Sequence, residues 1–213
     1  MSTRAVFFDF DGTLIDSMPA HVSAWSEILK GIGIVLEDKY FEMHEGEKAE
    51  DTIDTLLREN GIEMSDAERD ELIDRKRALY RSRAPKGLIP EARALVNSLR
   101  ERDIFCDIVT GSVKRNMTAV LSNEELALFR NIITPDDYQR GKPQPDPYLT
   151  ALKASGLVPG ACLVLENAPL GIRSAKAAGL YTLAITTTLP PYVLNDADRI
   201  ISSFQELIDS IKP

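Results

Sequence analysis

The chain has 213 residues, of which 33 are Asp or Glu and 25 are Lys or Arg, so its formal net charge at pH 7 is −8. This excess of acid argues against a protein that binds the nucleic-acid backbone, because that attraction depends on clustered Lys and Arg. No run approaches the roughly 20 apolar residues of a membrane span, and the N-terminus and the two cysteines, Cys106 and Cys162, indicate neither a secretory signal nor a disulfide framework. We therefore expect a cytoplasmic globular protein, a monomer or weak oligomer, with no nucleic-acid or membrane partner.

Short apolar runs recur along the chain with helical patterns between them. Six of them are predicted strands: residues 5–10, 104–110, 131–134, 161–166, 181–186 and 199–201. Because these runs are continuously apolar, they indicate strands that are covered on both faces, as in a parallel sheet. The alternation of strands and helices predicts a doubly wound, Rossmann-like α/β fold.

One long segment interrupts this alternation. From residue 19 to about residue 83 the sequence has only charged helical patterns and no convincing strand. A crossover between parallel strands needs far fewer residues than this. We therefore predict an α/β core domain of residues 1–16 and 87–213, and an inserted helical cap domain of residues 17–86.

The clearest motif lies at the end of the first predicted strand, where residues 8–13 read FDFDGT. Side chains two positions apart on a strand face the same way, so Asp9 and Asp11 are expected to point into one space. Ligands of open α/β sheets bind outside the carboxyl ends of the strands, which is where these acids lie. Two close carboxylates repel each other, so the pair implies either a raised pKa or a divalent cation, and Mg²⁺ suits hard oxygen ligands. An Asp-Gly turn that merely closes a strand would explain one of these acids but not both.

Four motifs in order along the chain resemble the haloacid dehalogenase superfamily of phosphatases, in the branch of phosphoglycolate phosphatases and β-phosphoglucomutases. They are DFDGT at residues 9–13, TGS at 110–112, GKPQPDPY at 141–148 and LENAPLG at 165–171. The predicted helical insertion matches the position of that family's mobile cap. The resemblance implies a phosphatase with a Rossmann-like core, a bound Mg²⁺ and a small phosphorylated substrate.

The resemblance also implies a role for each motif residue. Asp9 would attack phosphorus to form an aspartyl-phosphate, and Asp11 would protonate the leaving oxygen and then activate water. Lys142 would neutralise charge on Asp9 and on the phosphoryl group. The side chain of Thr110 and two backbone N–H groups would hold the phosphate oxygens; these N–H groups belong to Gly111 and Ser112. Taken singly, Thr110 would be an ordinary strand-end cap and Lys142 a solvated surface lysine.

The fourth motif differs from the family's usual pattern. The implied metal ligands are Asp9, Asp11, Glu166 and Asn167. The family commonly has two adjacent acids where this chain has Glu166 and Asn167. An amide oxygen can bind Mg²⁺ but adds no negative charge, so metal binding should be somewhat weaker. The alternative is that Asn167 only caps the turn into the following helix.

The cap holds three candidate substrate-binding residues: His21, Glu45 and Lys76. In the phosphohexose mutases of this branch, the loop that matches residues 44–52 carries a lysine and an arginine that hold the sugar phosphate. Glu45 and Ala49 occupy the matching positions here, so this second phosphate grip is missing. The HEG at residues 44–46 and the ENAP at 166–169 are more similar to branch members that hydrolyse inorganic pyrophosphate. Glu45 could reach the metal when the cap closes, or it could be part of a solvated helix end.

These observations lead to one main hypothesis and two alternatives. The main hypothesis is a Mg²⁺-dependent phosphohydrolase that acts on a small phosphorylated metabolite or on inorganic pyrophosphate. The first alternative is a phosphohexose mutase similar to β-phosphoglucomutase. The second is a non-catalytic protein that binds a phosphometabolite, which only Asn167 favours. Carbon–halogen chemistry is disfavoured because an acid at Asp11 has no role in it.

Overall fold

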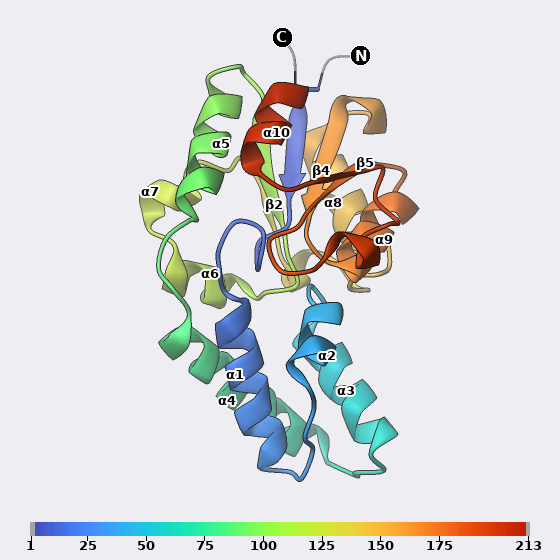
Figure 1. Cartoon of the computed structure of the whole chain (residues 1–213). Helices are drawn as coiled ribbons and strands as arrows, with labels where there is room; N and C mark the ends of the chain where they lie inside the picture. The colour runs from blue at the N-terminus through green and yellow to red at the C-terminus, as the bar shows by residue number, and fades with distance from the viewer. Residues whose placement is uncertain (1–2, 212–213) are drawn as a thin grey trace.

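The protein is described by a computed structural model that covers residues 3–211. Its centre is one parallel sheet of six strands in the order β3-β2-β1-β4-β5-β6 (Figure 1). The strands are β1 (Ala5–Phe8), β2 (Phe105–Val109), β3 (Ile132–Ile133), β4 (Cys162–Glu166), β5 (Tyr181–Ile185) and β6 (Arg199–Ile201). The prediction of a doubly wound α/β fold is confirmed.

Helices cover both faces of the sheet, which explains why the strands are continuously apolar. In β1, Val6 and Phe8 pack into one buried cluster, whereas Phe7 packs into another on the opposite face. The helices of the α/β part are α5 (Pro90–Arg100), α6 (Lys114–Val120), α7 (Asn123–Leu126), α8 (Asp146–Ser155), α9 (Pro169–Ala177) and α10 (Phe204–Ser210). Short 3₁₀ turns are η1 (Pro135–Asp137), η2 (Pro159–Ala161) and η3 (Pro191–Val193). Cys106 and Cys162 are buried free thiols in this core.

The first strand is shorter than predicted, and the reason bears on the site. β1 ends at Phe8, although residues 5–10 were expected to be extended. Beyond it the chain turns, with the N–H of Leu14 donating to the carbonyl of Phe10 and with Gly12 at a φ of +74°. A φ in this range favours glycine, which has no Cβ. Asp9 lies directly after the strand, where its N–H still donates to the carbonyl of Leu165 on β4, and Asp11 lies where the turn begins.

Four helices and no strand lie between β1 and α5 within the described residues. They are α1 (Met18–Lys30), α2 (Asp38–Met43), α3 (Ala49–Glu59) and α4 (Asp66–Arg83). They bury a hydrophobic cluster of their own, with Trp25, Ile53 and Leu72 among its members. Figure 1 shows this helical segment, called the cap below, beyond the end of the sheet toward which β1 points. The domain boundaries at residues 16/17 and 86/87 stay a prediction.

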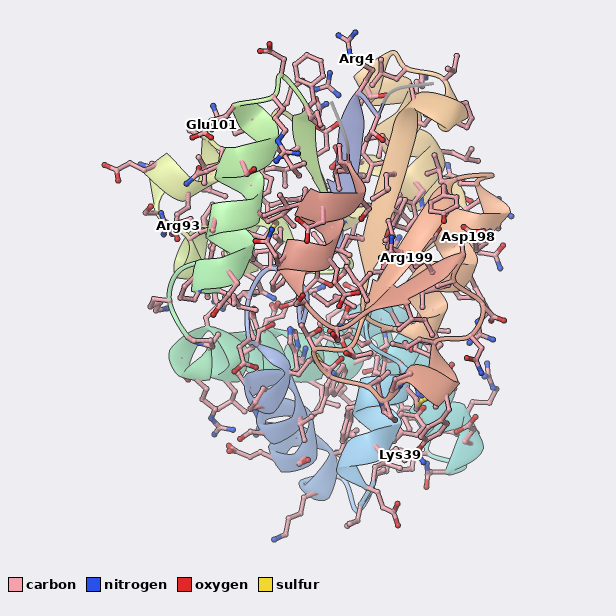
Figure 2. The ribbon with its side chains drawn as sticks, turned by 45° about the horizontal axis from the view of Figure 1, so that its top comes forward. Arg4, Lys39, Arg93, Glu101, Asp198 and Arg199 are labelled. Carbon is pink, nitrogen blue, oxygen red and sulfur yellow. The ribbon has the colours of Figure 1, made fainter. Side chains whose placement is uncertain are left out.

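Charged side chains cover the outside of the molecule, as Lys39, Glu101 and Arg199 illustrate in Figure 2. Among residues 3–211, no helix is both long enough and apolar enough to cross a bilayer.

Candidate active site

Asp9, the first acid after β1, belongs to a buried ion-pair cluster. Lys142 Nζ lies 2.6 Å from Asp9 Oδ1 and 2.6 Å from Glu166 Oε1. The hydroxyl of Tyr148 donates to the same Glu166 oxygen at 2.6 Å. Glu166 ends β4, which pairs in parallel with β1, so the two strand ends bring both acids to one edge of the sheet. Lys142 also donates to the carbonyl of Val109 at the end of β2, at 3.2 Å.

One ammonium thus faces two carboxyl groups, and all three side chains are almost fully buried. Burial lowers the pKa of Lys142, but the charges of Asp9 and Glu166 raise it more, so the lysine stays protonated. Burial raises the pKa of Asp9 to about 8, with Lys142 acting in the opposite direction. The second oxygen of this carboxylate, Asp9 Oδ2, is buried and has no hydrogen-bond partner within the described residues. A buried acceptor of this kind suits a cation or an electrophilic atom.

Asp11 is held by hydrogen bonds to both of its oxygens. Oδ1 accepts from Ser17 at 2.6 Å and from Tyr80 at 3.0 Å, and Oδ2 accepts from Ser112 at 2.6 Å. His21 Nε2 makes a further contact of 3.0 Å with Oδ1. Burial raises the pKa of Asp11, but His21, Ser112 and Ser17 lower it more, so its pKa is well below the usual range. Asp11 is therefore ionised in this arrangement.

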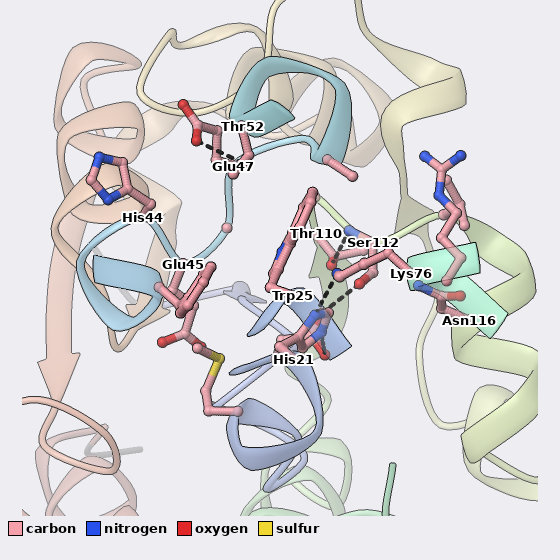
Figure 3. A pocket seen from close by; sticks show the side chains of 18 of the residues that line it. His21, Trp25, His44, Glu45, Glu47, Thr52, Lys76, Thr110, Ser112 and Asn116 are labelled. Carbon is pink, nitrogen blue, oxygen red and sulfur yellow. Dashed lines mark hydrogen bonds and ion pairs between the residues drawn. The ribbon is translucent and has the colours of Figure 1, made fainter. Parts of the chain in front are cut away.

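His21 connects Asp11 to a buried lysine of the cap. Lys76 Nζ lies 2.9 Å from His21 Nδ1 and 4.9 Å from the centre of the Trp25 ring (Figure 3). When Lys76 is protonated it can only donate, so Nδ1 accepts and the imidazole proton belongs on Nε2, toward Asp11. Burial, followed by the charge of Lys76, lowers the pKa of His21. His21 thus lies between Asp11 and Lys76, with one ring nitrogen near each.

Asn167 lies where cap and core meet. Its Nδ2 donates to Glu45 Oε1 at 2.8 Å and to Thr188 Oγ1 at 2.9 Å, while its Oδ1 accepts from Thr13 at 2.9 Å. Gly12 leaves room for this arrangement, because a Cβ there would lie 2.2 Å from Glu45 Oε1. Burial, followed by the charge of Asp9, raises the pKa of Glu45 well above its ordinary value.

The expected phosphate-binding loop follows β2. The backbone N–H of Ser112 donates to Thr110 Oγ1 at 2.9 Å, and Tyr138 donates to the carbonyl of Thr110 at 2.8 Å. A Cβ on Gly111 would lie 2.4 Å from the carbonyl oxygen of Gly46, so only glycine allows the cap loop to approach this closely. One of the two predicted backbone donors, the N–H of Ser112, is therefore already used within the loop.

The structure brings all of the predicted site residues together. A pocket that is partly open to solvent lies between cap and core (Figure 3). Predicted residues that line it are Asp9, Asp11, His21, Glu45, Lys76, Thr110, Gly111 and Ser112. Lys142 and Glu166 lie behind Asp9, and Asn167 lies behind Glu45.

The sequence reasoning missed the residues that hold these groups in place. Ser17 and Tyr80 bind Asp11, Thr188 binds Asn167, and Tyr148 binds Glu166. Tyr148 stands within the third motif and could have been singled out there. Thr188 lies in a loop with no recognisable pattern, so no signal pointed to it.

Comparison with known proteins agrees with this geometry. Residues 3–179 match the family described as haloacid dehalogenase-like hydrolase. Hexitol phosphatase A of Escherichia coli is 31% identical, over 100% of this chain and 97% of its own length. Beta-phosphoglucomutase of Bacillus subtilis is 29% identical, over 96% of this chain and 91% of its own. The crystal structure of a HAD hydrolase of family IA, variant 3, from Entamoeba histolytica superposes with a TM-score of 0.79 at 30% identity, over 100% of both chains.

The chain therefore belongs to the haloacid dehalogenase-like hydrolases. The predicted resemblance is confirmed, and so is the prediction of a phosphatase of that family.

Proposed function

We propose that this phosphatase is a Mg²⁺-dependent hydrolase that releases phosphate from a small phosphorylated metabolite or from inorganic pyrophosphate, with Asp9 as the nucleophile. The observation that carries this proposal is the state of the Asp9 carboxylate. Its Oδ1 is fixed by Lys142 at 2.6 Å, while its Oδ2 is buried and has no partner in residues 3–211. Oδ2 is thus oriented and unpaired, and once Lys142 and a bound cation hold Asp9 in its ionised form it would bond to phosphorus, as a covalent mechanism requires.

The donor set fits a hard cation. No group of three or more His, Cys, Asp or Glu side chains in the described part of the chain is arranged as a metal cluster, so neutral oxygens must contribute. Asp9, Asp11 and the amide oxygen of Asn167 would hold Mg²⁺. Glu166 is the fourth member of the predicted set. Hydrogen bonds already occupy its Oε1, the Oδ1 of Asn167 and both carboxylate oxygens of Asp11, so these contacts would rearrange when the cation binds. Bound Mg²⁺ would neutralise charge on the phosphoryl oxygens.

Asp11 is placed to move protons. Cleavage requires a proton on the leaving oxygen, and hydrolysis of the aspartyl-phosphate requires that a proton be taken from water. The lowered pKa of Asp11 suits the second step directly. For the first step Asp11 must gain a proton, which weakening of its hydrogen bonds from Ser17, Tyr80 and Ser112 would favour.

Charge compensation and phosphate binding would come from the core. Lys142 stays protonated and would offset the charge that develops as Asp9 bonds to phosphorus. Thr110, Gly111 and Ser112 line the same pocket as Asp9 and would hold the non-bridging oxygens.

The cap residues favour a compact, charged substrate. Lys76 is buried and places its ammonium at the pocket, with His21 between it and Asp11. Glu45 binds the amide of Asn167 instead of extending into solvent. This contact supports a role of Glu45 in the site and argues against the alternative that it is part of a solvated helix end. An anion next to Lys76 and a cation near Glu45 would together accommodate inorganic pyrophosphate with its metal ion.

A mutase remains the second candidate because a curated relative is a β-phosphoglucomutase. Glu45 and Ala49 both line the pocket, and neither can hold a second sugar phosphate as a cation would. Incubation with a hexose 1-phosphate separates the two functions, since a hydrolase yields free phosphate and a mutase yields the 6-phosphate.

The test of the hydrolase is phosphate release with and without Mg²⁺ in Asp9→Asn. Loss of the nucleophile should reduce turnover by about 10³-fold or more. The matched control is Asp16→Asn, because Asp16 is an exposed residue shortly after the first motif. Full activity in Asp9→Asn would refute the assignment of Asp9 as the nucleophile. Full activity in the presence of a chelator would refute the requirement for Mg²⁺. Binding without turnover in the unaltered protein would indicate the non-catalytic alternative.

A further inference from the structure

One polar side chain of the pocket has no role in the chemistry described above. Asn116 lies on α6, four residues after Ser112, and its side chain lines the pocket (Figure 3). It is almost fully buried, with 3% of its surface exposed. Its Oδ1 accepts a hydrogen bond of 3.2 Å from Arg81 Nη1. Because Arg81 belongs to α4, this contact joins the cap to the core.

The contact with Arg81 decides which way the amide of Asn116 points. A guanidinium has donors only, so it can bind the amide oxygen but not the amide nitrogen. The oxygen of the Asn116 amide must therefore face Arg81, and its nitrogen must point the other way. Nδ2 has no hydrogen-bond partner among residues 3–211, yet it is not sealed from solvent. Asn116 thus presents a fixed, unused donor to the pocket.

The surroundings of this donor are basic, although the chain as a whole is acidic. Lys76 and Arg77 line the same pocket. Burial, followed by the charge of Arg115, lowers the pKa of Arg81, and Arg77 acts in the same direction while Asp74 opposes it. Arg81, which contacts Asn116, therefore has Arg77 and Arg115 as charged neighbours. Arg77 is itself paired with Glu50 at 2.6 Å, and the carboxylates on the pocket lining are Asp9, Asp11, Glu45 and Glu47. Lys76 and the amide nitrogen of Asn116 are the groups of this lining that suit an anionic group.

We propose that Asn116 is a specificity-determining residue whose amide nitrogen donates a hydrogen bond to a second anionic group of the substrate, on the leaving-group side. This inference rests on the proposed phosphohydrolase function and narrows its substrate class. The substrate is a compact phosphate compound with a second anion close to the transferred phosphoryl group. That anion is either another phosphate, as in pyrophosphate, or a carboxylate, as in 2-phosphoglycolate. Both offer the oxygen acceptor that Nδ2 lacks, and phenyl phosphate has no such group.

The decisive variant is Asn116→Asp. It keeps the size of the side chain and an oxygen acceptor for Arg81, so the contact between cap and core remains. It replaces the donor with a negatively charged oxygen, which would repel a second anion. We expect kcat/KM for pyrophosphate or 2-phosphoglycolate to fall by about tenfold or more, mainly through KM. Turnover of phenyl phosphate should change by no more than about threefold. The substrate whose kcat/KM falls more, pyrophosphate or 2-phosphoglycolate, shows whether the second anion is a phosphate or a carboxylate.

Two arginine variants test the orienting contact. Arg81→Met should leave the amide of Asn116 free to rotate. Its kcat/KM for the anionic substrates should fall less than in Asn116→Asp, and again more than its kcat/KM for phenyl phosphate. Arg83→Met is the matched control, because Arg83 pairs with Glu27 and Ser23 on the outside of the same helix and should not affect either substrate. Thermal unfolding of each variant reports on folding separately from activity.

A binding measurement separates failure of this inference from failure of the proposed function. Calorimetry with pyrophosphate on Asp9→Asn, with and without Asn116→Asp, should show affinity weakened by about tenfold or more. Equal affinity in the two proteins, or equal loss of turnover with phenyl phosphate and the anionic substrates, would overturn the role of Asn116. Absence of turnover with every phosphate compound would instead overturn the proposed function, and the calorimetry would still decide this inference.

Discussion

The amide nitrogen of Asn167 donates a hydrogen bond of 2.8 Å to Glu45 Oε1, across 122 residues of chain and from the core to the cap. Asn167 occupies a position where a second acid is common in this family. An acid there would repel Glu45, whereas the neutral amide binds it. The replacement therefore does more than reduce the negative charge around a metal: it allows a carboxylate of the cap to enter the site.

Glu45→Ala is expected to lower turnover of pyrophosphate more than turnover of a generic aryl phosphate. The substitution removes the cap group that lies beside Asn167 and Asp9, where a charged, metal-bound substrate would be contacted. We expect a difference of about tenfold between the two substrates, measured as kcat/KM. Glu71→Ala, on an exposed position of α4, is the matched control. Equal losses on both substrates would remove Glu45 from the determinants of specificity.

Lys48→Met is expected to weaken the contact between the cap and the core. Lys48 Nζ donates to the carbonyl of Gln139 at 2.6 Å and to that of Tyr138 at 3.3 Å, and it lies 4.7 Å from the centre of the Tyr138 ring. Tyr138 in turn binds the carbonyl of Thr110, so this one ammonium connects the cap loop to the phosphate-binding loop. We expect KM to rise about three- to tenfold and hydrogen exchange of residues 44–52 to become faster.

Lys48→Arg should recover most of the lost affinity, because a guanidinium can donate to the same two carbonyls. Lys39→Met is the control, since Lys39 extends into solvent from α2 (Figure 2). Unchanged exchange of the cap loop in Lys48→Met would show that the contact does not hold the cap closed.

The candidate residues of the site could be named from local sequence motifs, whereas the residues that hold them in place could not, for a physical reason. Asp9 and Glu166 stand in short motifs at strand ends, and the ends of parallel strands converge. Lys142 stands in the motif at residues 141–148, in the loop before α8. Tyr80 and Thr188 are joined to the site only by folding, over separations of 69 residues to Asp11 and 21 residues to Asn167. A tyrosine on an amphipathic helix and a threonine in a loop have no local pattern that distinguishes them from neighbours without a role.

The titration of Lys76 is expected to shape the pH dependence of substrate binding. Burial lowers the pKa of Lys76 from 10.5 to about 8, although the charge of Asp11 acts in the opposite direction. If Lys76 binds an anionic group of the substrate, kcat/KM should fall as the pH rises above about 8, because the neutral amine attracts an anion weakly. Lys76→Met should be less active below pH 8 and should lose this descending limb of the profile. The same descending limb in Lys76→Met would assign it to another group.

The lowered pKa of Lys76 also makes the free energy of unfolding depend on pH. Between pH 8 and 10.5 the unfolded chain keeps its proton on Lys76 while the folded chain loses it. The unfolded state therefore binds more protons, so the contribution of this group to the free energy of unfolding rises with pH in that range. The free energy of unfolding, measured with urea, should be higher at pH 9.5 than at pH 7.5 in the unaltered protein. This difference should be smaller in Lys76→Met. An equal change in both proteins would show that Lys76 is not the group responsible.

Gly171→Ala is expected to displace Glu166 and, through it, the Lys142 ammonium that binds Asp9. Gly171 lies in the first turn of α9, and a Cβ there would lie 1.9 Å from Glu166 Oε1, the oxygen that binds Lys142 and Tyr148. Either the helix or Glu166 must shift, so we expect the free energy of unfolding to fall by about 1–3 kcal/mol. Displacement of Lys142 should also reduce kcat by about tenfold or more. Gly31→Ala, at a φ of −63° at the end of α1, is the control: its Cβ would approach only the carbonyl oxygens of Ile28, at 3.2 Å, and Glu27, at 3.9 Å. Wild-type kcat in Gly171→Ala would mean that Glu166 can move without displacing Lys142 from Asp9.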